Sequence, residues 1–226
     1  MMGRKNNIVL VIAPHPDDEV LGCGGTIAMH VANGDKVYVC VVTKGCPPLF
    51  GEDFVIRVRK ECVEADKLLG VTETFMWEFP AAMVENVPRH ELNDKFCGLI
   101  QTLRPDTVYI PNRGDMQLDH KLVVDACMVA MRPKYKHIVK SIYAYETMSE
   151  TGWDIPNMSN EFIPTMYCNI SEYIENKIKA LERFKTQIAD FPNARSVKAV
   201  RALAEYRGAM INVEAAEAFS VIREIR

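Results

Sequence analysis

Two short segments of the sequence carry residue types that can bind a divalent metal ion. The first is PHPDDE at residues 14–19, where His15, Asp17, Asp18 and Glu19 place four ionisable side chains within five positions. Neighbouring carboxylates repel one another unless a cation offsets their charge. Histidine combined with aspartate suits zinc or another borderline divalent metal better than calcium. The first segment therefore predicts a divalent metal site.

The second segment is PNRGDMQLDH at residues 111–120, which ends with Asp119 and His120. A catalytic zinc typically takes three protein ligands and keeps one position for water. The side chains of His15, Asp18 and His120 would complete such a set. This arrangement leaves Asp17 free to act as a general base on a water molecule.

The elements around these segments follow an α/β pattern. Continuous apolar runs, typical of strands buried on both faces, occur at 8–13, 37–42, 74–79 and 107–110. Segments with helical periodicity lie at 19–33, 54–69, 89–103 and 119–131. This alternation predicts a Rossmann-like, mostly parallel sheet flanked by helices. Ligands bind such sheets at the carboxyl ends of the strands. The first and fourth strands are neighbours in the usual doubly wound order, so we expect both segments to face one site.

The second half of the chain has a different pattern. Short strands are expected at 142–146 and 166–170, and from residue 171 onward the chain is expected to be helical, with breaks near 191–193 and near Gly208. The sequence has no internal repeat and no change of composition that would mark a linker between domains. We therefore expect one domain, 1–226, with a core over 1–133 and a helical C-terminal extension over 134–226 packed on it.

The two segments together resemble a known family. PHPDDE after the first strand and D-x-x-x-DH after the fourth are similar to motifs of the LmbE/PIG-L-like zinc-dependent de-N-acetylases. The later segments YETMSETGW (145–153), FPNARS (191–196), YRG (206–208) and AEAF (216–219) resemble a bacterial branch of that family associated with sugar modification. The resemblance implies hydrolysis of an N-acetyl group from an amino sugar or its glycoside.

Carried over by motif position, the resemblance makes His15, Asp18 and His120 ligands of Zn²⁺, with another divalent metal as an alternative. Asp17 would be the general base, and Asp119 would orient an imidazole or a partner beside the metal. Similar proteins often form homo-oligomers, which we also expect here.

One departure from the family motif bears on activity. The family's second motif usually reads H-x-D-H, and here Gln117 occupies the place of the first histidine. A glutamine amide can donate a hydrogen bond to an oxyanion but cannot deliver a proton. Asn112 and Asn193 also stand where the similar branch has histidine. A catalytically impaired homologue that binds metal and sugar is therefore the alternative to an active deacetylase.

Four arginines are candidates for binding substrate: Arg57, Arg59, Arg113 and Arg195. Arg57 and Arg59 lie on the second predicted helix, where the family often carries an arginine that contacts substrate. The alternative is that both are ordinary solvent-exposed charged residues of a helix. For Arg113 and Arg195, and for Glu217, a structural ion pair is the alternative to a sugar contact.

Composition excludes several other classes. The formal net charge of −3 means that the sequence lacks the excess of positive charge typical of proteins that bind nucleic acid. No apolar run reaches the roughly 18 to 20 residues of a membrane span. Seven scattered cysteines, an odd number without a C-x-x-C pair, indicate reduced thiols and a cytoplasmic location.

A nucleotide-dependent oxidoreductase is a third hypothesis. Residues 22–25 (GCGG) lack the G-x-G-x-x-G spacing of a dinucleotide-binding loop, and close packing of a helix on the sheet explains these glycines better.

Overall fold

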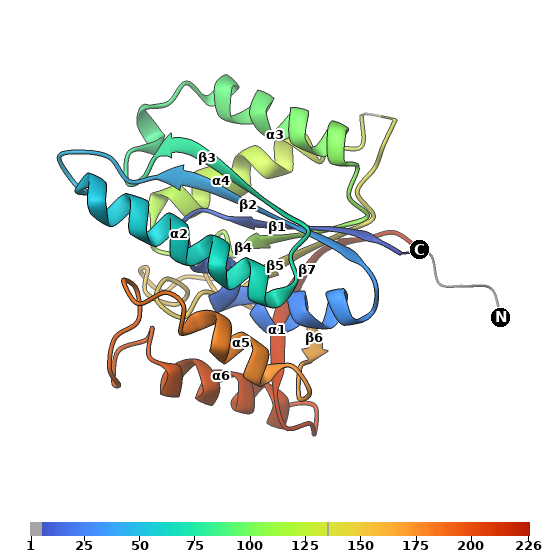
Figure 1. Ribbon diagram of the computed structural model, residues 1–226. Coiled ribbons are helices and arrows are strands. Elements are labelled where there is room, and N and C mark those ends of the chain that lie inside the picture. Colours follow the sequence, from blue (N-terminus) through green and yellow to red (C-terminus); the bar gives the residue numbers. More distant parts are fainter. Residues whose placement is uncertain (1–5, 135) are drawn as a thin grey trace.

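Seven strands form one sheet in the computed structural model, which describes residues 6–134 and 136–226 (Figure 1). The strands are β1 (Ile8–Ala13), β2 (Lys36–Lys44), β3 (Glu73–Pro80), β4 (Thr107–Pro111), β5 (Ser141–Tyr145), β6 (Met166–Asn169) and β7 (Ala216–Glu224). Their order across the sheet is β3-β2-β1-β4-β5-β7-β6. The first five in this order pair in parallel, and β7 is antiparallel to both β5 and β6. The α/β fold with a mostly parallel sheet is confirmed, and β1 and β4 are neighbours as expected.

Helices connect the strands and cover both faces of the sheet (Figure 1). They are α1 (Asp18–Ala32), α2 (Glu52–Leu69), α3 (Arg89–Leu103), α4 (Leu118–Ala130), α5 (Ile174–Leu181) and α6 (Val197–Ala209), with a short 3₁₀ helix η1 (Val84–Asn86). The four helices predicted in the first half are confirmed. Gly70 ends α2 with φ of 84°, the left-handed conformation that glycine adopts without steric cost.

Strand β1 is buried on both faces, which fixes the position of the loop that follows it. Val9 and Val11 belong to a core cluster with side chains of α1, α2 and α5, whereas Leu10 and Ile12 belong to a second cluster with side chains of α3 and α4. All four side chains are fully buried. Side chains alternate between the two faces of a strand, so both layers hold β1 in place. The loop of residues 14–19 therefore begins at a strand that is held in place on both faces.

The C-terminal part of the chain differs from the sequence-based expectation. Residues 216–224 were expected to be helical, but they form strand β7 between β5 and β6. The alanines of this segment favour a helix when it is considered alone. The unpaired edges of β5 and β6 offer it hydrogen-bond partners on both sides, and this tertiary context decides its conformation. The helical expectation for residues 216–224 was therefore wrong, whereas α5 and α6 confirm helical structure upstream of them.

The glycines of residues 22–25 lie inside α1 and let it approach its neighbours closely. A Cβ atom at Gly22 would lie 2.2 Å from Cδ2 of the Tyr145 ring, and one at Gly25 would lie 2.6 Å from Cδ1 of Ile170. Tyr145 is fully buried and its hydroxyl donates a hydrogen bond to the carbonyl oxygen of Ile12. Close packing thus explains these glycines.

Replacing Gly22 with alanine is expected to lower the free energy of unfolding by about 1–3 kcal/mol, because the new methyl group overlaps a buried ring. Gly98→Ala on α3 is the matched control, since among the described residues no atom outside the adjacent turns of α3 lies within 4 Å of the Cβ position there. That control should raise the free energy of unfolding by about 0.5–1 kcal/mol through helix propensity. Chemical denaturation measures both values, and a G22A variant as stable as the wild type would contradict the packing argument.

Candidate functional site

The two predicted segments meet at the carboxyl ends of β1 and β4. The loop after β1 carries His15, and Asp18 is the first residue of α1. His120 lies in the first turn of α4, which follows the loop after β4. One ligand atom from each of these three side chains lies within 4.8 Å of the others. Three potential metal ligands from distant parts of the sequence are thus brought together.

Each imidazole has one ring nitrogen beside a carboxylate outside the cluster and the other ring nitrogen facing Asp18. Nε2 of His15 lies 2.9 Å from Oδ2 of Asp119, and Nδ1 of His120 lies 2.8 Å from Oδ2 of Asp115. The remaining nitrogens lie 3.5 Å (His15 Nδ1) and 3.3 Å (His120 Nε2) from Oδ2 of Asp18. Histidine ligands of metals usually donate their second ring N–H to such a carboxylate, which fixes the ring and its tautomer.

The donor atoms fit a divalent cation. His120 is fully buried, and within residues 6–134 and 136–226 its Nε2 has no hydrogen-bond partner, although this nitrogen faces Asp18. Burial opposes protonation of His15, but the carboxylates of Asp119 and Asp18 outweigh it and raise its pKa to about 9. In the same way, burial opposes protonation of His120, while Asp18 and Asp115 raise its pKa to about 10. The surroundings thus strongly favour positive charge, and two nitrogens and a carboxylate are the donors that zinc prefers.

Asp17 lies beside the cluster in an uncommon backbone conformation. Its φ angle is 117°, which is rare for a residue other than glycine and is typically found at functional sites. Asp17 is 1% exposed, and its Oδ2 has no hydrogen-bond partner among the described residues. Nε of Arg195 lies 3.5 Å from that oxygen. Burial raises the pKa of Asp17 to about 7, although the Arg195 guanidinium opposes the shift.

A pocket of about 180 Å³ opens next to Asp17 and His15. One wall is apolar and includes Phe50, Phe54 and Val58 from the loop before α2 and from α2 itself. The phenyl rings of Phe50 and Phe54 are stacked, with 6.3 Å between their centroids. A small ligand in this pocket would contact both an apolar surface and the polar cluster, as is usual for ligand sites.

Comparison with known proteins assigns the chain to a family. The family model PIG-L, described as GlcNAc-PI de-N-acetylase, matches residues 10–131, more than half of the chain and both segments of the site. The chain belongs to the PIG-L family.

Relatives of this PIG-L protein include named deacetylases. "Uncharacterized deacetylase YaiS" of Escherichia coli is 28% identical over 81% of this chain and 93% of its own length. "Probable N-acetyl-alpha-D-glucosaminyl L-malate deacetylase 2" of Bacillus anthracis is 26% identical over 82% of this chain and 84% of its own length. The conserved protein TT1542 of Thermus thermophilus has a similar structure, with a TM-score of 0.78, 26% identity and coverage of 96% of both chains.

Among the described residues, no helix combines the length and apolar character needed to cross a membrane.

The structure brings several other predicted residues of the PIG-L site to the pocket. Gln117, Arg59 and Arg195 all line it. Nη1 of Arg59 donates to the backbone carbonyl oxygen of Trp77, and Nη1 of Arg195 donates to Oε1 of Gln187. Gln117 directly precedes α4, so its side chain stands at the pocket wall.

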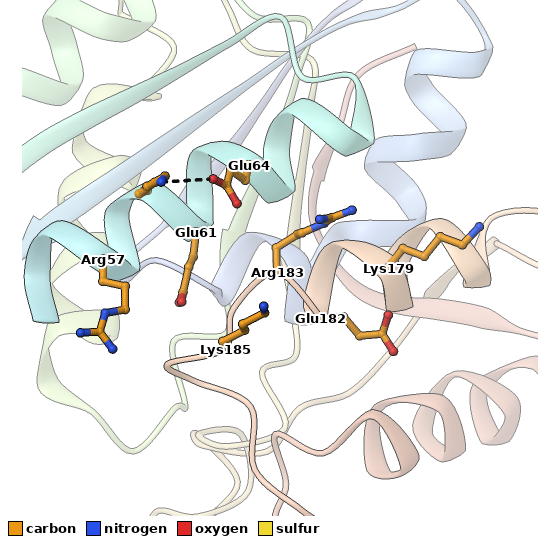
Figure 2. Close-up of a pocket in the computed structure, with 8 residues that line it drawn as sticks. Arg57, Glu61, Glu64, Lys179, Glu182, Arg183 and Lys185 are labelled. Atoms are coloured by element: carbon orange, nitrogen blue, oxygen red, sulfur yellow. Dashed lines mark ion pairs between the residues drawn. The ribbon is translucent and has the colours of Figure 1, made fainter.

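Other predicted residues lie elsewhere. Arg57 lines a separate cavity between α2 and α5 (Figure 2). Arg113 is exposed and forms an ion pair with Asp125, with 2.7 Å between Nε and Oδ1. Glu217 is buried and forms an ion pair with Lys177. The structure therefore does not bring Arg57, Arg113 or Glu217 to the pocket.

Sequence reasoning did not assign a role to Asp115 or to the loop after β5. Asp115 is fully buried, and Oγ1 of Thr151 donates to its Oδ1 at 2.6 Å. In the same loop, Glu150 accepts a hydrogen bond from the backbone N–H of Gln117, and Ser149 accepts one from Nε of Arg195. The available signal was the aspartate that opens D-x-x-x-DH, but the spacing alone did not show which imidazole it contacts.

Asp115→Asn is expected to weaken zinc affinity by about 10–100-fold, because the amide no longer holds the His120 ring in one tautomer. Competition with a chromogenic chelator measures the affinity. Asp125→Asn is the control, since Asp125 pairs with exposed Arg113 away from the cluster. Equal zinc affinity in D115N and wild type would rule out this supporting role.

Proposed function

We propose that this PIG-L protein is a metal-dependent hydrolase that removes an N-acetyl group from an N-acetylated amino sugar or its glycoside or conjugate. The observation that carries the proposal is the cluster of His15, Asp18 and His120. In each imidazole, the ring nitrogen that does not face Asp18 lies beside another carboxylate. The names of relatives that act on N-acetylglucosaminyl malate or on diacetylchitobiose support an amino-sugar substrate.

In this proposal, His15, Asp18 and His120 hold a divalent ion, with zinc as the expected metal. A bound ion of this kind polarises a carbonyl group and lowers the pKa of water. Asp17 accepts the proton of the attacking water as the tetrahedral intermediate forms, and it later passes that proton to the leaving amine. The side-chain amide of Gln117 donates a hydrogen bond to the developing oxyanion. Arg59 and Arg195 bind polar groups of the sugar at the pocket wall.

The second candidate function is a metal- and sugar-binding homologue with impaired catalysis. The position of Gln117 in the pocket favours it, because this side chain cannot supply the proton that a histidine there would supply. In the active enzyme, Asp17 has to carry the proton alone. Gln117→His separates the two candidates, since it should raise the rate strongly only if proton delivery limits the native protein.

The experiment that tests the proposal measures acetate release by the zinc-loaded protein across a panel of N-acetyl amino sugars and their glycosides. The metal content of the same sample is measured in parallel. About one metal per chain with metal-dependent acetate release supports the deacetylase. Metal and sugar binding without release from any compound, restored by Gln117→His, supports the impaired homologue. A protein that binds no metal at any zinc concentration refutes both.

We also propose the setting in which the enzyme works. Residues 1–226 act as one catalytic domain in the cytoplasm, and the protein forms a homo-oligomer. The seven cysteines, all free thiols in the structure, suit a reducing compartment. Nucleic acid is not expected as a partner, given the formal net charge of −3.

A further inference from the structure

A second cavity, of about 430 Å³, lies between α2 and α5 (Figure 2). Helix α2 contributes four charged side chains to it, and α5 with the turn that follows contributes four more. The lining residues are Arg57, Lys60, Glu61, Glu64, Lys179, Glu182, Arg183 and Lys185. None of the described residues lines both this cavity and the pocket beside Asp17. It is therefore a separate feature of the surface.

Two of the three carboxylates in this cavity already have partners. Oε2 of Glu61 accepts hydrogen bonds from the backbone N–H and the hydroxyl of Thr186, at 3.1 and 2.5 Å. Glu64 lies 3.9 Å from Nζ of Lys60. Glu182 is the remaining carboxylate. The negative charge available to neutralise further cations is therefore small.

Four cations of the cavity lack such partners. Within residues 6–134 and 136–226, no hydrogen bond or ion pair engages the side chain of Arg57, Lys179, Arg183 or Lys185. Lys179 lies in the last turn of α5, and Arg183 lies in the turn that follows this helix. Four unpaired positive charges thus surround one concavity that holds a single unpaired negative charge.

A concave surface with an excess of charges of one sign concentrates the electric field and attracts ions of the opposite sign. Guanidinium groups bind phosphate through paired hydrogen bonds, and lysines add point charges. The volume of this cavity, about 430 Å³, is that of a small-molecule site rather than of a groove for a polymer. We propose that the cavity binds a small, multiply charged anion of the phosphate-ester class, at a site distinct from the deacetylase pocket.

Isothermal titration calorimetry with fructose 1,6-bisphosphate at low ionic strength tests the proposal, with fructose as the uncharged control. The wild type should bind the bisphosphate and not fructose, and added salt should weaken binding. The double variant Arg183→Ala/Lys185→Ala should bind at least about tenfold more weakly, since it removes two of the unpaired cations. Both side chains are exposed, so this change should not disturb the core.

The matched control is Lys36→Ala/Lys67→Ala, which changes the net charge equally at exposed positions outside the cavity. It should retain affinity within about twofold. Arg59→Ala, in the other pocket, should also retain it. Absence of bisphosphate binding by the wild type overturns the proposal. So does equal weakening in the two double variants, or binding that disappears with Arg59→Ala.

Discussion

Asp17→Asn is expected to lower the turnover number by about 10²–10⁴-fold while zinc affinity stays close to that of the wild type. Asp17 is 1% exposed, and its Oδ2 has no hydrogen-bond partner in the part of the chain that the structure describes, which leaves this oxygen available to a water molecule. An asparagine has nearly the same shape but cannot accept a proton. Asp17 is not among the three clustered ligands, so the metal should remain.

Acetate release and metal content of the D17N variant, measured on one sample, provide this test. Asp125→Asn is the control for the loss of a carboxylate, because Asp125 lies outside the pocket and pairs with Arg113. Its turnover should match the wild type. Unchanged turnover in D17N would refute the assignment of Asp17 as general base, and loss of metal would make Asp17 a ligand instead.

Lys177→Met is expected to lower the free energy of unfolding by about 3–5 kcal/mol, because it leaves a buried carboxylate without its counter-ion. Nζ of Lys177 lies 2.5 Å from Oε1 of Glu217 and 2.7 Å from the carbonyl oxygen of Leu21. The Glu217 carboxylate also accepts hydrogen bonds from the backbone N–H groups of Gly25 and Thr26. This buried group joins α5, β7 and α1, the helix that begins with Asp18.

Lys179→Met, two residues further along α5, is the control for this variant. Lys179 is exposed, so the control should change the free energy of unfolding by no more than about 0.5 kcal/mol. The double variant Lys177→Met/Glu217→Gln should lose less stability than the sum of its single variants, because the two side chains interact directly. A K177M variant as stable as K179M would contradict the assigned role of the pair.

The strands that position the site could be predicted from the sequence because the patterns that indicate them extend over only a few residues. Strand β1 appears in the sequence as a continuous apolar run, and Leu10 and Val11 are indeed buried on opposite faces. A general rule for parallel sheets then places the ends of β1 and β4 at one edge. Motif similarity selected His15, Asp18 and His120, and the structure brings these side chains together.

The side chains around that cluster depended on tertiary structure. Arg57 and Arg59 are two residues apart on α2, and an α-helix turns about 200° over that distance, so they point in nearly opposite directions. The packing of α2 turns Arg59 toward the pocket and Arg57 toward the second cavity. No pattern in the sequence distinguishes them, because both are arginines on the same charged helix.

By itself, the sequence determined the α/β class, the positions of the first four strands and helices, and the segments that carry the candidate metal ligands. Only the tertiary structure decided that residues 216–224 form a strand, because that depends on the free edges of β5 and β6. It also decided that Asp119 contacts His15, 104 residues away, while Asp115 contacts His120. Local propensity and spacing act over a few residues, whereas these contacts exist only once distant segments have packed.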